Sequence, residues 1–209
     1  MDALSTAAKR KYFFALLYFC EGAPIGFIWW MLPTQLRSAG VPVERITLMT
    51  SLLVLPWALK FLWAPAVDLN QNKRWTLKSW IVTSQIMMSV SMIPLLILDL
   101  SADYQIVFFF LLLHTISAAT QDVAIDALCI TSVPLEEQGR INGWMQAGML
   151  AGRSVFGGIA LMVSVYLGVI SVLTIMIVMI ITVAIMLTVV TIPQRDREDN
   201  RSLKGILQS

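Results

Sequence analysis

Six ionisable side chains fall inside long apolar stretches of this 209-residue sequence, and they are the first candidates for chemistry. They are Glu21, Lys60, His114, Asp122, Asp126 and Arg153. A charged group in hydrocarbon costs several kcal/mol unless it is paired or faces water, so such residues commonly mark an ion or substrate pathway. We therefore expect the five charged members, all except the histidine, to line a path for protons and substrate between apolar helices.

Asp122 and Asp126 form the sharpest pattern, because residues four apart share one face of a helix. Two carboxylates that lie close together in a low dielectric repel each other, so such a pair can hold one proton near neutral pH. Lys60 is expected at an overlapping depth, where it would pair with one of the aspartates. Two other interpretations stay open: a purely structural Asp–Lys pair between helices, and a Lys60 side chain that reaches the membrane surface alone.

Glu21 and Arg153 are candidates for binding an ion and a substrate group. Glu21 precedes Gly22 and Pro24, where the proline frees a backbone carbonyl, and a carboxylate beside irregular backbone suits a cation or a proton. The planar fork of Arg153 suits a carboxylate or phosphate on an anionic substrate. Each residue has a structural alternative, with Glu21 as a neutral link between helices and Arg153 as its counter-ion.

His114 and the tryptophans carry weaker signals. His114 lies in an apolar stretch, where a hydrogen-bonded core histidine is favoured over a member of a proton relay. Four tryptophans fit either a pocket wall or the aromatic belt at a membrane surface. They are Trp29, Trp30, Trp57 and Trp63.

Membrane-spanning helices must position these residues, because 57% of the chain is hydrophobic and only 13% is charged. A soluble domain is usually about a quarter charged, and a spanning helix needs about 20 mostly apolar residues. We therefore expect an all-α integral membrane protein, with a six-helix bundle in residues 1–192 and a polar cytoplasmic tail in residues 193–209. The expected helices are residues 12–36, 46–67, 76–98, 104–131, 139–163 and 166–192.

The loop charges predict the orientation of this bundle. With a cytoplasmic N-terminus, eleven lysines and arginines fall in cytoplasmic segments, and only Arg37 and Arg45 fall outside. Positively charged loops are retained in the cytoplasm, so both termini are expected there. Cys20 and Cys129 both fall inside spans, which argues against a disulfide framework.

The two halves of the bundle match in kind. An acid-bearing helix, with Glu21 or with Asp122 and Asp126, is followed by a helix with one base, Lys60 or Arg153. An uncharged helix ends each half. Three crossings reverse the orientation of the chain, so this order predicts two inverted three-helix repeats, a pattern found in secondary transporters. The uncharged third and sixth helices would then face lipid, outside a polar cavity.

Small residues predict close packing of the first and fifth helices, because small side chains four apart let two backbones approach in lipid. The series are Gly22 and Gly26 on the first helix, and Gly148 with Gly152 and Gly143 with Ala147 and Ala151 on the fifth.

Two stretches resemble AmpG-like members of the major facilitator superfamily. The segment from Leu55 to Asp68, LPWALKFLWAPAVD, resembles the end of their second helix. The segment Thr120–Asp126, TQDVAID, followed by Pro134–Gly139, PLEEQG, resembles their fourth helix and the loop after it. Glu21–Pro24 also fits their first helix. This group contains muropeptide permeases, siderophore importers of the inner membrane, and acetyl-coenzyme A transporters.

The resemblance implies the N-terminal six-helix half of a 12-helix fold with alternating access, often driven by protons. Asp68, Lys73 and Arg74 match the family's cytoplasmic gate motif between helices two and three, in which the acid meets a helix N-terminus of the other half. From the sequence alone, Asp68 equally fits a solubilising charge at a helix end. One departure is that relatives often carry an arginine where this chain has Leu150, with Arg153 one turn later.

Together these features predict half of a secondary active transporter that takes up a small solute, such as a muropeptide or siderophore, with protons across a bacterial inner membrane. The expected partners are the bilayer, the solute, protons, and a missing C-terminal half or a second chain; no nucleic acid, cofactor or metal is expected. Two alternatives are an acetyl-coenzyme A transporter and a non-transporting scaffold or assembly protein. An enzyme is not expected, because paired-aspartate chemistries need a second acidic motif on a facing helix, and the sequence offers none.

Overall fold

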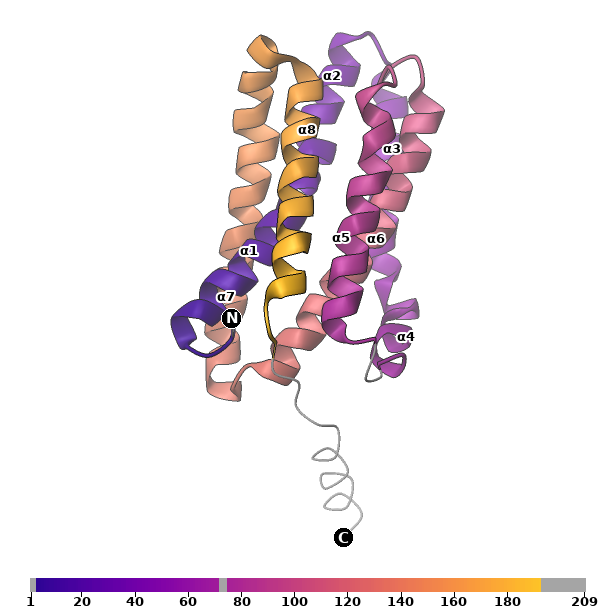
Figure 1. The fold of residues 1–209 in the computed structure, drawn as a ribbon. Helices are drawn as coiled ribbons and strands as arrows, with labels where there is room; N and C mark the ends of the chain where they lie inside the picture. Colours follow the sequence, from indigo (N-terminus) through magenta and orange to yellow (C-terminus); the bar gives the residue numbers. More distant parts are fainter. Residues whose placement is uncertain (1–2, 72–74, 193–209) are drawn as a thin grey trace.

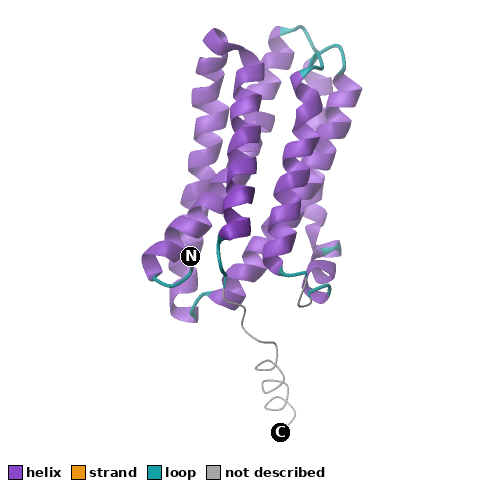
Figure 2. Ribbon diagram, in the orientation of Figure 1, coloured by secondary structure: helices purple, strands orange, loops and turns teal. Residues whose placement is uncertain are grey.

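The structure, a computed structural model, describes residues 3–71 and 75–192. Every regular element in these residues is a helix (Figure 2), and the helices run alongside one another as an upright bundle (Figure 1). Five stretches of the described chain are long and apolar enough to cross a membrane. They are Ala7–Ser38, Val43–Leu62, Leu77–Leu96, Tyr104–Ser132 and Leu135–Val189.

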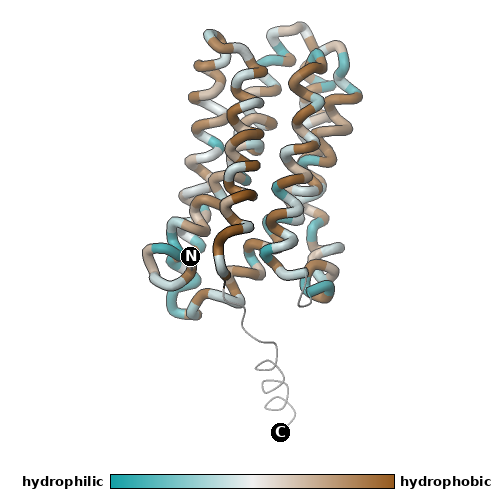
Figure 3. Tube along the Cα trace, in the orientation of Figure 1, coloured by the Kyte–Doolittle hydropathy of each residue, from teal (hydrophilic) through white to brown (hydrophobic). Residues whose placement is uncertain are grey.

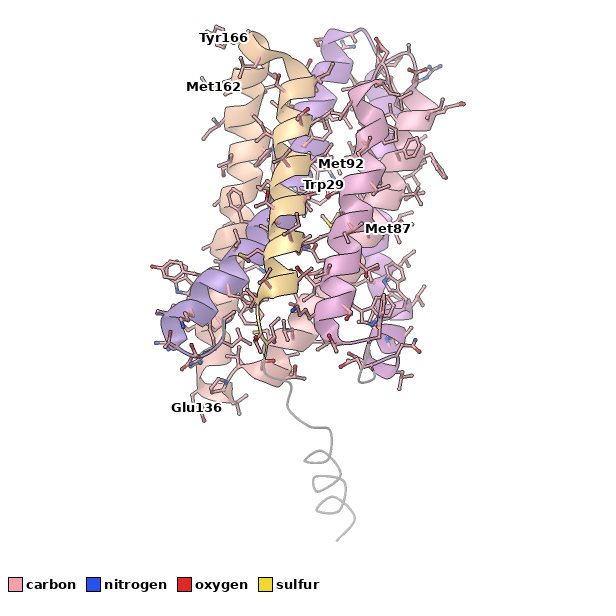
Figure 4. All side chains as sticks on the ribbon, in the orientation of Figure 1. Trp29, Met87, Met92, Glu136, Met162 and Tyr166 are labelled. Atoms are coloured by element: carbon pink, nitrogen blue, oxygen red, sulfur yellow. The ribbon has the colours of Figure 1, made fainter. Side chains whose placement is uncertain are left out.

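The last of these stretches crosses twice. Its 55 residues would measure about 80 Å as one helix, against about 30 Å for the hydrocarbon core. At Gly168 the backbone takes φ 77° and ψ 160°, a conformation that residues with a Cβ rarely adopt. The chain runs from Glu136 at one end of the bundle to Tyr166 at the other (Figure 4) and then returns along α8 (Figure 1). The predicted all-helical membrane architecture is therefore confirmed, and the reversal at Gly168 divides the last stretch into two segments that are each long enough to cross.

The described chain contains twelve helical elements, here in chain order. The elements are α1 (Ala7–Gly26), the π-helical η1 (Phe27–Met31), α2 (Leu32–Ser38), α3 (Val43–Leu59), the 3₁₀ turn η2 (Lys60–Leu62), α4 (Ala64–Leu69), α5 (Leu77–Met92), the 3₁₀ turn η3 (Ile93–Leu96), α6 (Tyr104–Ser132), α7 (Leu135–Arg153), the π-helical η4 (Ser154–Ile159) and α8 (Ala160–Val189).

The α-helix is interrupted within two of the expected helices, and prolines explain both interruptions. The second helix, expected over residues 46–67, breaks between α3 and α4, because Pro65 at the start of α4 has no N–H to continue the hydrogen-bond ladder. The third, expected over residues 76–98, leaves the α-helix after Met92 and tightens into the 3₁₀ turn that contains Pro94. The break in the second crossing matters for function, since it places Lys60 on a turn.

The helix pair α1 and α7 packs at very short range, and glycines permit it. A Cβ added at any of the four glycines predicted to pack would overlap backbone atoms of the other helix: Gly22 with Met149, Gly26 with Arg153, Gly148 with Ala15, and Gly152 with Phe19. Gly143 differs, because a Cβ there would meet nothing within 4 Å. The contact face of α7 therefore follows the series of Gly148 and Gly152.

The outer surface of the bundle is apolar, as lipid contact requires. Apolar residues run along the lengths of the helices, while polar residues gather toward the ends (Figure 3). The span Val43–Leu62 is the most open, with only 22% of its apolar window buried. Inside the bundle, α5 packs against α6 and α8.

Asp99 organises the turn between α5 and α6 and gives a pH-dependent prediction. Its carboxylate accepts hydrogen bonds from the Ala102 N–H at 2.8 Å and from the Ser101 N–H and hydroxyl at 2.9 and 2.7 Å. The Ala102 amide, followed by the Ser101 groups, lowers the pKa of Asp99 below its ordinary value.

An acid whose pKa is lowered by folding stabilises the folded turn at pH values above its unfolded pKa, which is about 3.9 for aspartate. This contribution is lost as pH falls through the lower pKa of the folded state. We therefore expect the amide chemical shifts of Ser101 and Ala102 to stay constant down through the ordinary carboxyl range and to change only below it. An NMR titration checks this, and a midpoint at the ordinary aspartate value would contradict it.

Candidate functional site

A cavity of about 660 Å³ opens between four of the six crossings. Its wall comes from α1 with η1, from α3 with η2, from α6 and from α7; among the described residues, α5 and α8 add nothing to it. The five charged residues predicted to form a pathway all lie in this wall: Glu21, Lys60, Asp122, Asp126 and Arg153. The geometry thus agrees with the expectation that helices three and six lie outside the cavity.

Lys60 and Asp122 form an ion pair across the cavity, from Lys60 Nζ to Asp122 Oδ2. The Asp122 side chain is 9% exposed and the Lys60 side chain 34% exposed, so the cation stays in contact with the cavity while the acid is enclosed. Because Lys60 lies on the η2 turn, it marks the point where the second crossing stops being α-helical. This is the pairing that the depths of the two residues predicted.

Tyr18 joins the two aspartates. Its hydroxyl lies 3.0 Å from Asp122 Oδ1 and 2.6 Å from Asp126 Oδ1, in a buried position. Tyr18 is not among the residues predicted from the sequence, since a tyrosine in an apolar helix is not distinctive by residue type alone. A positional signal exists, because Tyr18, Glu21 and Ile25 are spaced three and four residues apart and so share one face of α1.

Glu21 is fully buried and only half satisfied. Its Oε1 accepts a hydrogen bond from the indole N–H of Trp57 at 3.3 Å, and its Oε2 finds no partner among the described residues. A buried carboxylate needs hydrogen bonds or a counter-charge. The second oxygen is therefore an open position for a proton or a hydrogen-bond donor.

Arg153 faces the cavity without an anionic partner in the described part of the chain. Its guanidinium donates to the thioether of Met149 at 3.0 Å and lies 5.7 Å from the ring centre of Trp29, while its Nε is buried with no partner. The counter-ion alternative is not observed, because no ion pair joins Arg153 to Glu21 in the described residues. A guanidinium held by a sulfur and an aromatic face retains its capacity to bind an anion.

The remaining predicted residues divide between wall and core. Trp29 and Trp57 line the cavity with ring centres 6.0 Å apart, and Trp29 lies within the bundle between its two ends (Figure 4). His114 lies outside the cavity wall, fully buried, with one ring nitrogen 3.0 Å from the Met88 carbonyl oxygen. His114 is therefore a core histidine and not a residue of the cavity wall. Cys20 and Cys129 are both buried free thiols.

The predicted gate motif is only partly within the structure. Asp68 lies on α4 and is exposed, whereas Lys73 and Arg74 lie outside the described residues, as does the expected tail of residues 193–209. The gating role of this motif stays a prediction.

Comparison with known proteins gives a family and two relatives. A sequence model of the Major Facilitator Superfamily matches residues 14–208. An uncharacterised protein of Haemophilus influenzae is 29% identical over 145 residues, which make up 64% of this chain and 33% of that protein. An uncharacterised membrane protein of Saccharomyces cerevisiae is 33% identical over 76 residues, which make up 35% of this chain and 14% of that protein. The chain spans about a third or less of the length of these relatives.

Proposed function

The chain belongs to the major facilitator superfamily, and from this premise we propose that it is one six-helix half of a secondary transporter that takes up a small solute together with protons. The observation that carries the proposal is the cavity wall. Two carboxylates on one face of α6 are joined by a tyrosine hydroxyl and paired with a lysine. Such a group can bind and release a proton inside the membrane, which is the requirement for proton coupling.

The cavity would be completed by a second six-helix half, supplied by a longer protein or by another chain. Two observations support this part of the proposal: the matched relatives are longer than the chain, and among the described residues α5 and α8 add nothing to the cavity wall. In this arrangement both termini are cytoplasmic, and Asp68, Lys73 and Arg74 act at the cytoplasmic gate, as in AmpG-like members. A bacterial inner membrane is the proposed location.

Arg153 supports a solute that carries a negative charge. A cation in the cavity wall without an acidic partner among the described residues suits a carboxylate or phosphate on the solute. A muropeptide or a siderophore is the proposed solute, with acetyl-coenzyme A as the alternative.

Replacing Arg153 with glutamine should lower uptake of an anionic solute by roughly 10- to 100-fold, since a hydrogen bond to a charged group is worth about 1.5–3 kcal/mol. Arg153→Lys should retain part of the uptake, because lysine keeps the positive charge but lacks the planar, bidentate guanidinium group. Competition by charged and neutral analogues of a labelled muropeptide measures the effect. Arg37→Gln, at the end of α2, is the matched control; equal losses in both variants would exclude a role in solute recognition.

The proposed function is tested in membrane vesicles from cells that express the chain from its own gene, so that whatever completes the cavity is present. With an imposed pH gradient, alkaline on the cytoplasmic face, a labelled muropeptide should accumulate while the vesicle interior acidifies. The scaffold alternative predicts a different result: neutral variants of Glu21, Asp122 and Arg153 would change folding or partner capture, and no solute flux would depend on them.

A further inference from the structure

The hydroxyl of Tyr18 carries one proton but lies within hydrogen-bond distance of two carboxyl groups. It lies 2.6 Å from Asp126 Oδ1 and 3.0 Å from Asp122 Oδ1, and both distances are those of O–H···O hydrogen bonds. A phenol can donate to only one acceptor at a time. The second contact therefore needs a hydrogen from the aspartate side, which means that one of the two carboxyl groups donates to the phenolic oxygen. The geometry fits two aspartates that hold one proton between them.

The two acids differ in what else they touch. Asp122 is buried, and its second oxygen accepts a hydrogen bond from Lys60. Asp126 is half-buried at the cavity wall and bonds only to Tyr18 among the described residues. Both acids line the cavity, but Asp126 is the more exposed of the two, so a proton in the cavity reaches Asp126 more readily, and the Tyr18 hydroxyl connects Asp126 to the more buried Asp122.

The other charged and titratable groups around the cavity leave this order intact. α1 contributes Glu21, on the same helix face as Tyr18, η2 contributes Lys60, and α6 contributes Cys129 besides the two aspartates. α7 contributes Arg153, and its remaining polar lining residues are neutral amides. Within the described chain, Lys60 is the cation bonded to the pair.

We propose that Tyr18 is a proton relay between Asp126 and Asp122, and that the arrival of the proton on Asp122 releases Lys60. This inference rests on the proposed proton-coupled function and adds the group that links proton entry to the ion pair. It also gives Asp126 and Asp122 different tasks: the first exchanges protons with the cavity, and the second holds or releases the lysine.

The transfer balances in one concerted step. The carboxyl of Asp126 gives its proton to the phenolic oxygen of Tyr18, while the phenolic proton moves to Asp122 Oδ1. Tyr18 ends as it began, a neutral phenol, now donating to the Asp126 carboxylate. Asp122 has become a neutral acid and the negative charge now lies on Asp126, so the charge–charge attraction between Asp122 and the Lys60 ammonium is lost. Lys60 is thereby released from Asp122 toward the cavity side, where Asp126 lies.

Infrared difference spectroscopy tests the relay without knowledge of the solute. The chain is reconstituted in lipid, and spectra in mildly acidic and mildly alkaline buffer are compared. Wild-type protein should show one band for a neutral, hydrogen-bonded aspartic acid, and Asp126→Asn and Asp122→Asn should each lose it, since the proton is shared. Tyr18→Phe should also lose the band at its wild-type position. Tyr12→Phe, which removes a hydroxyl from an exposed tyrosine on the same helix, should keep it. A Tyr18→Phe spectrum equal to wild type overturns the proposal.

A second measurement does not depend on the folding of Tyr18→Phe. Carbon-13 labelling of the ring carbon that bears the hydroxyl reports the C–O stretch of the four tyrosines. One of these bands should shift on acidification of wild-type protein and stay constant in Asp126→Asn, whereas no shift in wild type would refute the relay.

The relay and the transport proposal can fail separately. Proton-driven uptake that persists in Tyr18→Phe removes the relay and leaves transport. Absence of uptake with the expected infrared bands removes transport and leaves the relay.

Discussion

Asp122→Asn is expected to reduce proton-driven solute accumulation to the level of vesicles that lack the protein, while exchange of solute down its own gradient continues. Asparagine keeps the shape of the side chain, but it neither carries the charge that holds Lys60 nor takes up a proton. Coupling needs a site that changes charge during the cycle, whereas downhill exchange needs only an open cavity. Accumulation and counterflow of a labelled muropeptide, measured in the same vesicles, separate the two activities.

The matched control is the double variant Lys60→Met with Asp122→Asn. The single variant leaves Lys60 without its anion, and breaking a buried ion pair costs about 3–5 kcal/mol, less here because 34% of the lysine side chain is exposed. Replacing both partners is often neutral for stability. If the pair only locks two helices together, the double variant should accumulate solute normally. If the pair couples protons to transport, the double variant should fold well but still fail to accumulate solute. Asp103→Asn, at the N-terminal end of α6 and away from the cavity wall, should behave as wild type.

The charged residues could be assigned to one cavity from the sequence because a charged side chain is energetically unfavourable in the hydrocarbon core of a membrane. A buried charge in a spanning helix must face a partner or water, so the residue types alone favoured a shared site for Glu21, Lys60, Asp122, Asp126 and Arg153. The same argument placed the two uncharged crossings outside the polar cavity, and in the structure α5 and α8 contribute no described residue to its wall.

Features without a charge were harder to predict. Tyr18 was missed because only its place on the face of Glu21 distinguishes it, and a helix face becomes informative after one functional residue is known. The break after Leu59 depends on Pro65, which a hydropathy window averages away. The reversal at Gly168 lies a few residues beyond the expected boundary, since the chain around it is uniformly apolar and one glycine is the main local signal. The inverted repeat stays a prediction.

Gly148→Ala is expected to have the largest effect on folding, although it adds a single methyl group. The new Cβ would overlap the carbonyl oxygen of Ala15, and its next neighbours are also backbone atoms of α1. Side chains can rotate away from a new methyl group, but a helix backbone cannot, so α1 and α7 must separate. Overpacking of a well-packed core costs about 1–3 kcal/mol, and we expect the upper end of this range or more. Thermal stability in detergent, followed by size-exclusion chromatography, measures the loss.

Gly143→Ala isolates the cause, because it adds the same methyl group to the same helix at a position with nothing within 4 Å. There alanine should be neutral or stabilising by about 0.5–1 kcal/mol, since it is a better helix former than glycine. Only Gly148→Ala should therefore destabilise the protein, and an equal loss of stability in both variants would show that α1 and α7 lie farther apart than the structure places them. The close approach also matters for the site. Glu21 and Tyr18 lie on α1 and Arg153 on α7, so any separation of this pair moves one wall of the cavity relative to the other.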